Sequence, residues 1–178
     1  MSRVSLVTAA AGERAELLGQ IQSAFGATPN MFKAVANSPA ALKSMWATFG
    51  ALGKGVIGAK LGEQIAVAIA DRNDCEYCLA AHTALGRKAG ATAQEMSAAQ
   101  AGVSDDPKTE AALRFALAVV NNRAKISDEQ VQDLRRAGFG DEEMVEILAH
   151  VALNLFTNYV NVAFQVPVDF PTVQLRAK

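Results

Sequence analysis

Two cysteines and a histidine stand at a spacing that can support thiol redox chemistry. Cys75 and Cys78 are three residues apart, and His82 follows four residues after Cys78. Residues three and four apart on a helix are neighbours on one face, so the sulfurs would lie within disulfide reach, with the imidazole beside them. Asp74 is a suitable N-cap, which would place both cysteines where the positive helix end favours thiolate. The spacing therefore predicts a reactive dithiol with a histidine that handles its proton.

The same three side chains supply what the reduction of a peroxide needs. That reaction uses a thiolate to attack the O–O bond, a proton donor for the leaving oxygen, and a second thiol to capture the sulfenic acid. Glu63 lies twelve residues before Cys75 on the preceding predicted helix. An antiparallel return through the Asn73-Asp74 turn could bring it beside His82. A carboxylate there would orient the imidazole and hold its proton.

Other interpretations of this cluster stay open. The cysteines and His82 could be buried core residues without chemistry. They could also hold a metal ion, but one C-x2-C and one histidine make an incomplete zinc site that His150, the only other histidine, would have to complete. Glu63 alone could be a solvated helix residue. We expect Tyr77, between the cysteines, to pack beside the site or cover it rather than to act directly.

The elements that must hold these residues are helices. Apolar residues recur at helical spacing and alternating strand patterns are missing, which predicts an all-α fold of about eight to nine helices. The cysteine helix is expected over residues 75–89, and the helix before it over about 59–72. The other helices are expected over residues 13–25, a short segment from 29, then 39–52, a helix capped at 92, 107–120, one from 127 to before 138, and 141–164.

The last predicted helix is apolar nearly all round, which indicates that it is central and also contacts another subunit. Asn154, Asn158 and Asn161 fall on it at spacings of four and three. Buried amides need hydrogen-bond partners. We expect these amides to cap the cysteine-bearing hairpin or to face another subunit, and substrate binding is a further possibility.

Length and composition narrow the class of protein. The 178 residues suit a single domain, residues 1–178, with a substantial core. Seventeen basic residues balance eighteen acidic ones and are scattered, so a nucleic-acid partner is not expected. The longest uninterrupted apolar runs, of which Ile65–Ala70 is one, are too short to span a bilayer, and the first residues lack the pattern of a secretory signal. Two cysteines so close together do not make a disulfide scaffold, so we expect a cytoplasmic protein.

The site residues resemble a known family. Glu63, Cys75-Glu76-Tyr77-Cys78 and His82 match the E-x11-C-x2-C-x3-H pattern of the AhpD-like alkylhydroperoxidases, within the carboxymuconolactone decarboxylase superfamily. Thr28–Phe32, Ser38-Pro39 and Asn154–Pro171 resemble the opening and the tail of its peroxidase-related branch. The resemblance covers most of the chain, and it implies an AhpD-like helical bundle, assembly into trimers or hexamers, and thiol-dependent peroxidase activity.

Carried over residue by residue, the resemblance makes Cys78 the peroxidatic nucleophile and Cys75 the thiol that resolves it into a Cys75–Cys78 disulfide. Glu63 and His82 become the proton relay. The implied partners are a hydroperoxide substrate and an external dithiol or thioredoxin-like reductant, with no bound cofactor. Tyr77 stands where the best-known members carry a second histidine, and a phenol cannot act as a base near neutral pH.

Two other functions fit the same fold. Because Tyr77 shortens the relay, the chain could be a thiol–disulfide reductase or a redox sensor instead of a peroxidase. It could also be a non-enzymatic helical assembly module, with or without a metal. The superfamily's muconolactone decarboxylation is not expected to need a cysteine pair, and the intact pair here argues against that activity.

Overall fold

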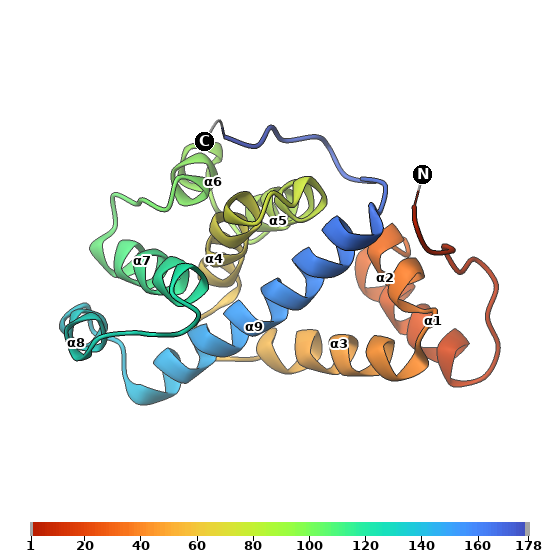
Figure 1. Ribbon diagram of the computed structural model, residues 1–178, viewed down its shortest axis with the longest axis horizontal. Helices are drawn as coiled ribbons and strands as arrows, with labels where there is room; N and C mark the ends of the chain where they lie inside the picture. The colour runs from red at the N-terminus through yellow and green to blue at the C-terminus, as the bar shows by residue number, and fades with distance from the viewer. Residues whose placement is uncertain (1, 177–178) are drawn as a thin grey trace.

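Every regular element in the computed structural model, which describes residues 2–176, is an α-helix (Figure 1). The described residues contain no strand, so the all-α prediction is confirmed. The helices are α1 (Glu13–Phe25), α2 (Asn30–Val35), α3 (Pro39–Leu52), α4 (Ala59–Arg72), α5 (Glu76–Lys88), α6 (Ala93–Gln100), α7 (Pro107–Asn121), α8 (Asp128–Arg136) and α9 (Asp141–Phe164).

Side-chain caps set the beginnings of several helices where the sequence predicts them. The Ser38 hydroxyl accepts a hydrogen bond from the Ala41 amide at the start of α3. Thr92 and Ser127 each form a capping box with the residue three positions on, which satisfies two free donors at each helix start. These local signals explain why the predicted and observed helix starts agree closely.

Helices α4 and α9 form the centre of the molecule. All seven residues from Gln64 to Ala70 on α4 are buried, and α5 packs along this helix. Helix α9 runs diagonally across the fold and contacts α2, α3, α4, α5 and α7 (Figure 1). The hairpin made by α4 and α5 is therefore part of the core and packs against the last helix, as a rigid site requires.

The segment after α9 returns across the molecule toward α6 (Figure 1). The Asp169 carboxylate accepts a hydrogen bond of 2.8 Å from the backbone amide of Asn30, at the start of α2. Further along, the backbone amide of Arg176 donates to Asp71 on α4 at 3.0 Å. This tail therefore ties α2 to the α4–α5 hairpin.

Helix α9 has a buried face and an exposed face, and both contain apolar residues. By length and composition alone it could cross a membrane, but the core helix of a globular protein passes the same test. Its buried residues include three asparagines, which suit a helix packed against polar groups of its own protein. The large apolar side chains exposed on it are Val145, Leu148, Phe156, Tyr159, Val162 and Phe164.

Candidate redox site

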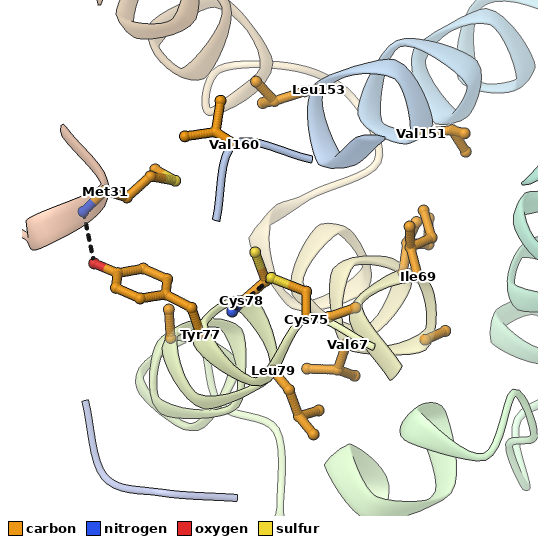
Figure 2. Packing of buried hydrophobic residues seen from close by; sticks show 14 of the residues in the cluster. Met31, Val67, Ile69, Cys75, Tyr77, Cys78, Leu79, Val151, Leu153 and Val160 are labelled. Carbon is orange, nitrogen blue, oxygen red and sulfur yellow. Dashed lines mark hydrogen bonds between the residues drawn. The ribbon is translucent and has the colours of Figure 1, made fainter. Parts of the chain in front are cut away.

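The two cysteines lie at the start of α5, immediately after a tight turn. Asp74 adopts left-handed backbone geometry, with φ of 55°, and Cys75 rather than Asp74 is the N-cap, so the predicted cap was wrong by one residue. Asp tolerates this conformation because its short polar side chain can bond locally. The Cys75 sulfur accepts a hydrogen bond from the Cys78 amide at 3.2 Å, and Figure 2 shows the two sulfurs close together. Both cysteines are free thiols and both are buried.

The surroundings give the two sulfurs opposite acidities. Burial raises the pKa of Cys78, but a hydrogen bond from Cys75, the charge of His82, the hydrogen bond from Asn161 and the nearby Asn158 amide lower it from 9.0 to about 7. The neighbouring Cys78 sulfur and burial raise the pKa of Cys75. Near neutral pH the pair therefore holds its negative charge on Cys78 and its proton on Cys75.

His82 lies on the same helix face as Cys78, one turn later, and contacts Glu63 on α4. Its Nδ1 lies 2.7 Å from a Glu63 carboxylate oxygen. Burial lowers the pKa of His82, but the charge and hydrogen bond of Glu63 outweigh it, and the Cys78 sulfur adds to them, so the pKa is raised above 6.5. The hairpin thus brings together the four residues that the sequence singled out, and the charge of His82 helps to lower the pKa of the Cys78 thiol.

The asparagines of α9 meet the cysteine hairpin. Asn161 donates a hydrogen bond to the Cys78 sulfur at 3.2 Å. Asn158 accepts one at 3.0 Å from Asn73, in the turn before the cysteines. Asn154 instead donates to the His150 carbonyl of its own helix. Their spacing predicted a shared face, but the contact of Asn161 with the sulfur depends on how α9 crosses α5, which the sequence alone does not fix.

Tyr77 points away from the two sulfurs (Figure 2). Its hydroxyl accepts a hydrogen bond of 3.1 Å from the backbone amide of Met31, and its ring meets that of Phe170 edge to face at 5.7 Å. Burial is the main cause that raises the pKa of this phenol, so it stays neutral. Tyr77 therefore fastens α2 and the tail over the cysteine helix, in keeping with the covering position expected for it.

A narrow apolar cavity of about 30 Å³ reaches Cys78 and His82. A cavity of this volume holds about two water-sized atoms. Its walls come from α1, α2, α3, α5 and the tail, and the aromatic side chains that line it are Phe25, Phe32, Phe49, Tyr77 and Phe170. The sequence did not predict these lining residues, because they come together only through tertiary packing.

A wider open groove of about 380 Å³ lies on the other side of the dithiol, where it reaches Cys75. Its lining comes from the start of α5, with Asp74, Glu76 and Tyr77, and from the end of α9 and the tail, with Asn161, Val162 and residues 165–168. The two cysteines thus border different spaces: Cys78 a small apolar cavity and Cys75 a larger open groove.

The position of His150 does not favour the metal alternative. The ring of His150 lies against Gly62 on α4, where a Cβ atom would be 3.0 Å from its Cε1. Among residues 2–176, no group of three or more His, Cys, Asp and Glu side chains could hold a metal ion. His150 therefore does not complete a ligand set with the cysteines.

Comparison with known proteins agrees with this geometry. The model of the carboxymuconolactone decarboxylase family matches residues 39–118, which include α4, α5 and the dithiol. An uncharacterized peroxidase-related protein from Silicibacter sp. TM1040 is 25% identical, with a TM-score of 0.83 over 93% of this chain and 91% of its own. The chain is therefore similar to the carboxymuconolactone decarboxylase family over the region that holds the dithiol, and to this peroxidase-related protein over most of its length.

Two further solved structures share the fold. An AhpD-core peroxidase-related protein from Ralstonia eutropha JMP134 is 24% identical, with a TM-score of 0.84 over 94% of this chain and 92% of its own. The debrominase Bmp8 is 22% identical, with a TM-score of 0.74 over 88% and 86% of the two chains. No functionally curated protein matches the chain. Since one similar fold is that of a debrominase, similarity of fold alone does not specify the reaction.

Proposed function

We propose that the protein is a thiol-dependent peroxidase of the alkylhydroperoxidase type. The Cys78 thiolate attacks the terminal oxygen of a hydroperoxide, the O–O bond breaks, and Cys78 becomes a sulfenic acid. His82 gives its proton to the leaving alkoxide, which departs as an alcohol. The Cys75 thiol then displaces the sulfenic hydroxyl, which leaves as water, and a Cys75–Cys78 disulfide forms. Two electrons pass from the dithiol to the peroxide.

The single observation that carries this proposal is the contrast between the two cysteines. Cys78 has a pKa lowered to about 7 and borders a cavity, while the pKa of Cys75 is raised. An attacking thiol works best when its pKa is near the ambient pH, and a resolving thiol need only be close. Glu63 lies against Nδ1 of His82, which leaves Nε2 to carry the proton for the leaving oxygen.

The cavity favours a peroxide with an apolar substituent. Its aromatic walls present no charged side chain apart from His82 beside the sulfur. Two water-sized atoms match the O–O group that must reach Cys78, with the organic part lying toward the aromatic rim. We therefore propose organic hydroperoxides, in preference to charged ones, as the substrate class.

An external dithiol or thioredoxin-like protein completes the cycle in this proposal, in the cytoplasm. A thiolate of the reductant attacks one sulfur of the Cys75–Cys78 disulfide and forms a mixed disulfide. The second thiol of the reductant then attacks that mixed disulfide, so the reductant leaves as a disulfide and its two electrons and two protons restore the Cys75 and Cys78 thiols. We also propose a homo-oligomer, trimer or hexamer, because the exposed face of α9 presents several large apolar side chains. Light scattering of the purified protein tests that assembly.

A thiol–disulfide reductase is the second candidate function. The groove beside Cys75 favours it, because at about 380 Å³ it could admit a disulfide substrate that the small cavity at Cys78 excludes. In that case Glu63 and His82 would serve only to keep the pKa of Cys78 low for thiol–disulfide exchange.

Stopped-flow oxidation under anaerobic conditions separates these functions. With tert-butyl hydroperoxide the reduced protein should form an intramolecular disulfide far faster than a free thiol reacts, Cys78→Ser should abolish the reaction, and Cys75→Ser should stop at the sulfenic acid. Faster reaction with a small disulfide such as oxidised lipoamide than with any peroxide would instead favour the reductase. Oxidation by peroxide no faster than that of a free thiol refutes the peroxidase.

A further inference from the structure

Beside the Cys78 sulfur, two buried asparagines of α9 leave a hydrogen-bond donor and a hydrogen-bond acceptor unused. Asn158 and Asn161 are three residues apart, on one face of α9, and are 0% and 3% exposed. Asn161 contacts the Cys78 sulfur, and Asn158 is near enough to help lower the pKa of that thiol. We propose that these two amides are catalytic: they stabilise the Cys78 thiolate and then bind the oxygen that the sulfur acquires. This inference rests on the proposed peroxidase function.

The Asn161 amide has a donor in use and an acceptor without a partner. Its Nδ2 donates to the Cys78 sulfur at 3.2 Å, which stabilises the thiolate form because hydrogen bonds to a charged acceptor are strong. Its Oδ1 is buried and has no hydrogen-bond partner among the described residues. A buried acceptor without a hydrogen bond lowers the stability of the fold, and a substrate or intermediate that donates to it would remove that cost.

In Asn158 it is the hydrogen-bond donor, not the acceptor, that has no partner among the described residues. Its Oδ1 accepts the hydrogen bond from Asn73, which fixes the direction of the amide. Its Nδ2 is then left buried and without a partner in the described part of the chain. One free donor and one free acceptor therefore stand on neighbouring turns of the helix that covers Cys78.

The free Asn158 Nδ2 donor and the free Asn161 Oδ1 acceptor match the hydrogen-bonding capacity of the reacting oxygen. When Cys78 attacks a hydroperoxide, the new S–O bond carries an O–H group, which can accept from the Asn158 Nδ2 and donate to the Asn161 Oδ1. The leaving alkoxide takes its proton from His82, so the amides neither gain nor lose a proton. Donors and acceptors already in place cost no reorganisation when the bond to oxygen forms.

Substitutions in a Cys75→Ser background test the amides, since the sulfenic acid at Cys78 cannot then be resolved. Asn158→Leu and Asn161→Leu remove each amide while they keep its approximate volume. Asn154→Leu is the matched control, because Asn154 is equally buried on α9 but bonds its own helix carbonyl. For each variant, alkylation of Cys78 by iodoacetamide is followed against pH, and sulfenic acid formation with tert-butyl hydroperoxide is timed by dimedone capture.

We expect the amide substitutions to slow the reaction with peroxide much more than alkylation. Asn161→Leu should raise the Cys78 pKa in the alkylation profile. Above that pKa, where the sulfur is fully thiolate, each of the two amide variants should slow peroxide reaction about tenfold or more, while alkylation stays within about twofold of the background. Asn154→Leu should leave both rates within about twofold. Rescue of part of the peroxide rate by Asn158→Gln would further support a hydrogen-bonding role.

Two results would overturn the inference. If peroxide reaction and alkylation slow by the same factor, the amides only maintain the shape of the site. If the amide variants keep the full peroxide rate, their free atoms bind no reacting oxygen and are satisfied by ordered water alone. The peroxidase function fails separately, when the unsubstituted site reacts with peroxide no faster than a free thiol, and oxygen binding by the amides is then rejected with it. The alkylation pKa still decides whether Asn161 stabilises the thiolate.

Discussion

The carboxylate of Glu63 lies 2.7 Å from Nδ1 of His82, across the α4–α5 hairpin. The two residues are nineteen positions apart in the chain. The His82 side chain is 11% exposed and the Glu63 side chain is 22% exposed. A carboxylate in this position fixes the ring and holds its proton. In the proposed peroxidase reaction, the proton for the leaving oxygen therefore depends on a residue that need not touch the substrate.

Glu63→Gln should weaken the proton donor without removing the histidine. The amide lacks the negative charge that raises the pKa of His82, so that pKa falls, and the high-pH limb of peroxide turnover shifts toward lower pH. Loss of the donor at pH 8 should slow turnover by about tenfold to a hundredfold. Glu76→Gln, which removes an exposed carboxylate from the first turn of α5, is the control and should leave the profile unchanged. An unshifted limb in Glu63→Gln would exclude the relay.

Replacement of Cys75 by two different residues should separate its hydrogen bond from its volume. A hydrogen bond from Cys75 is the largest cause that lowers the pKa of Cys78, against the opposing effect of burial. Serine can still donate that bond and alanine cannot. Alkylation of Cys78 should therefore follow a pKa near 7 in Cys75→Ser and a clearly higher one in Cys75→Ala. Equal values in the two variants would mean that His82 and the amides alone hold the thiolate.

The sequence was sufficient to predict most of the helices and the residues of the dithiol hairpin. Capping residues such as Ser38, Thr92 and Ser127 act within one turn, so they mark helix starts without tertiary information. The position of Glu63 beside His82 could be anticipated because a short turn forces the two helices to lie antiparallel. Cys75 was misplaced by one residue, since the left-handed backbone of Asp74 depends on how the turn closes.

The parts of the site that come from distant segments could not be predicted in this way. Phe170 lies more than ninety residues after Tyr77, and its ring reaches the site only because the tail folds back over α5. Asn161 shared a predicted face with two other asparagines, but only the crossing of α9 over α5 decides which amide meets the sulfur. Periodicity gives the face of a helix, whereas packing decides what that face contacts.

Folding stability should depend on pH through Cys78 and His82 in opposite directions. Cys78 has its pKa lowered to about 7 from 9.0, so its contribution is complete above pH 9.0 and is lost as pH falls through 7. The pKa of His82 is raised, so its contribution is complete below pH 6.5 and is lost as pH rises through the folded-state value. Near pH 7 to 9 the two contributions partly offset each other.

Cys78→Ala isolates the cysteine contribution. Urea unfolding under reducing conditions should show that this variant loses more stability relative to the natural chain at pH 9 than at pH 6, by about 1–2 kcal/mol. Val151→Ala, a buried truncation without a titrating group, should lose the same amount at both pH values. A loss by Cys78→Ala that does not change with pH would mean that Cys78 titrates alike in the folded and unfolded chains.

Tyr77→Phe should affect stability more than catalysis. The variant keeps the ring against Phe170 but leaves the Met31 amide without its acceptor, which should cost about 1–3 kcal/mol. Because the hydroxyl points away from the sulfurs, peroxide reduction by the folded variant should stay within a few-fold of the original rate. Thermal unfolding and turnover measured on the same preparation check both parts. A loss of a hundredfold in turnover with unchanged stability would instead assign the phenol to the chemistry.

Leu85→Ala should enlarge the cavity beside His82 and change which peroxides react. Leu85 lines that cavity one turn beyond the histidine on α5. With the side chain shortened, a bulky substrate such as cumene hydroperoxide should gain several-fold in kcat/KM relative to hydrogen peroxide, because pocket discrimination of this kind is worth about 1–3 kcal/mol. Leu79→Ala, on the same helix but absent from the cavity wall, should lose more stability because Leu79 is fully buried, and should keep the original ratio. If both leucine variants leave the ratio unchanged, peroxides reach Cys78 by a route other than this aromatic cavity, and the groove beside Cys75 becomes the entrance to test next.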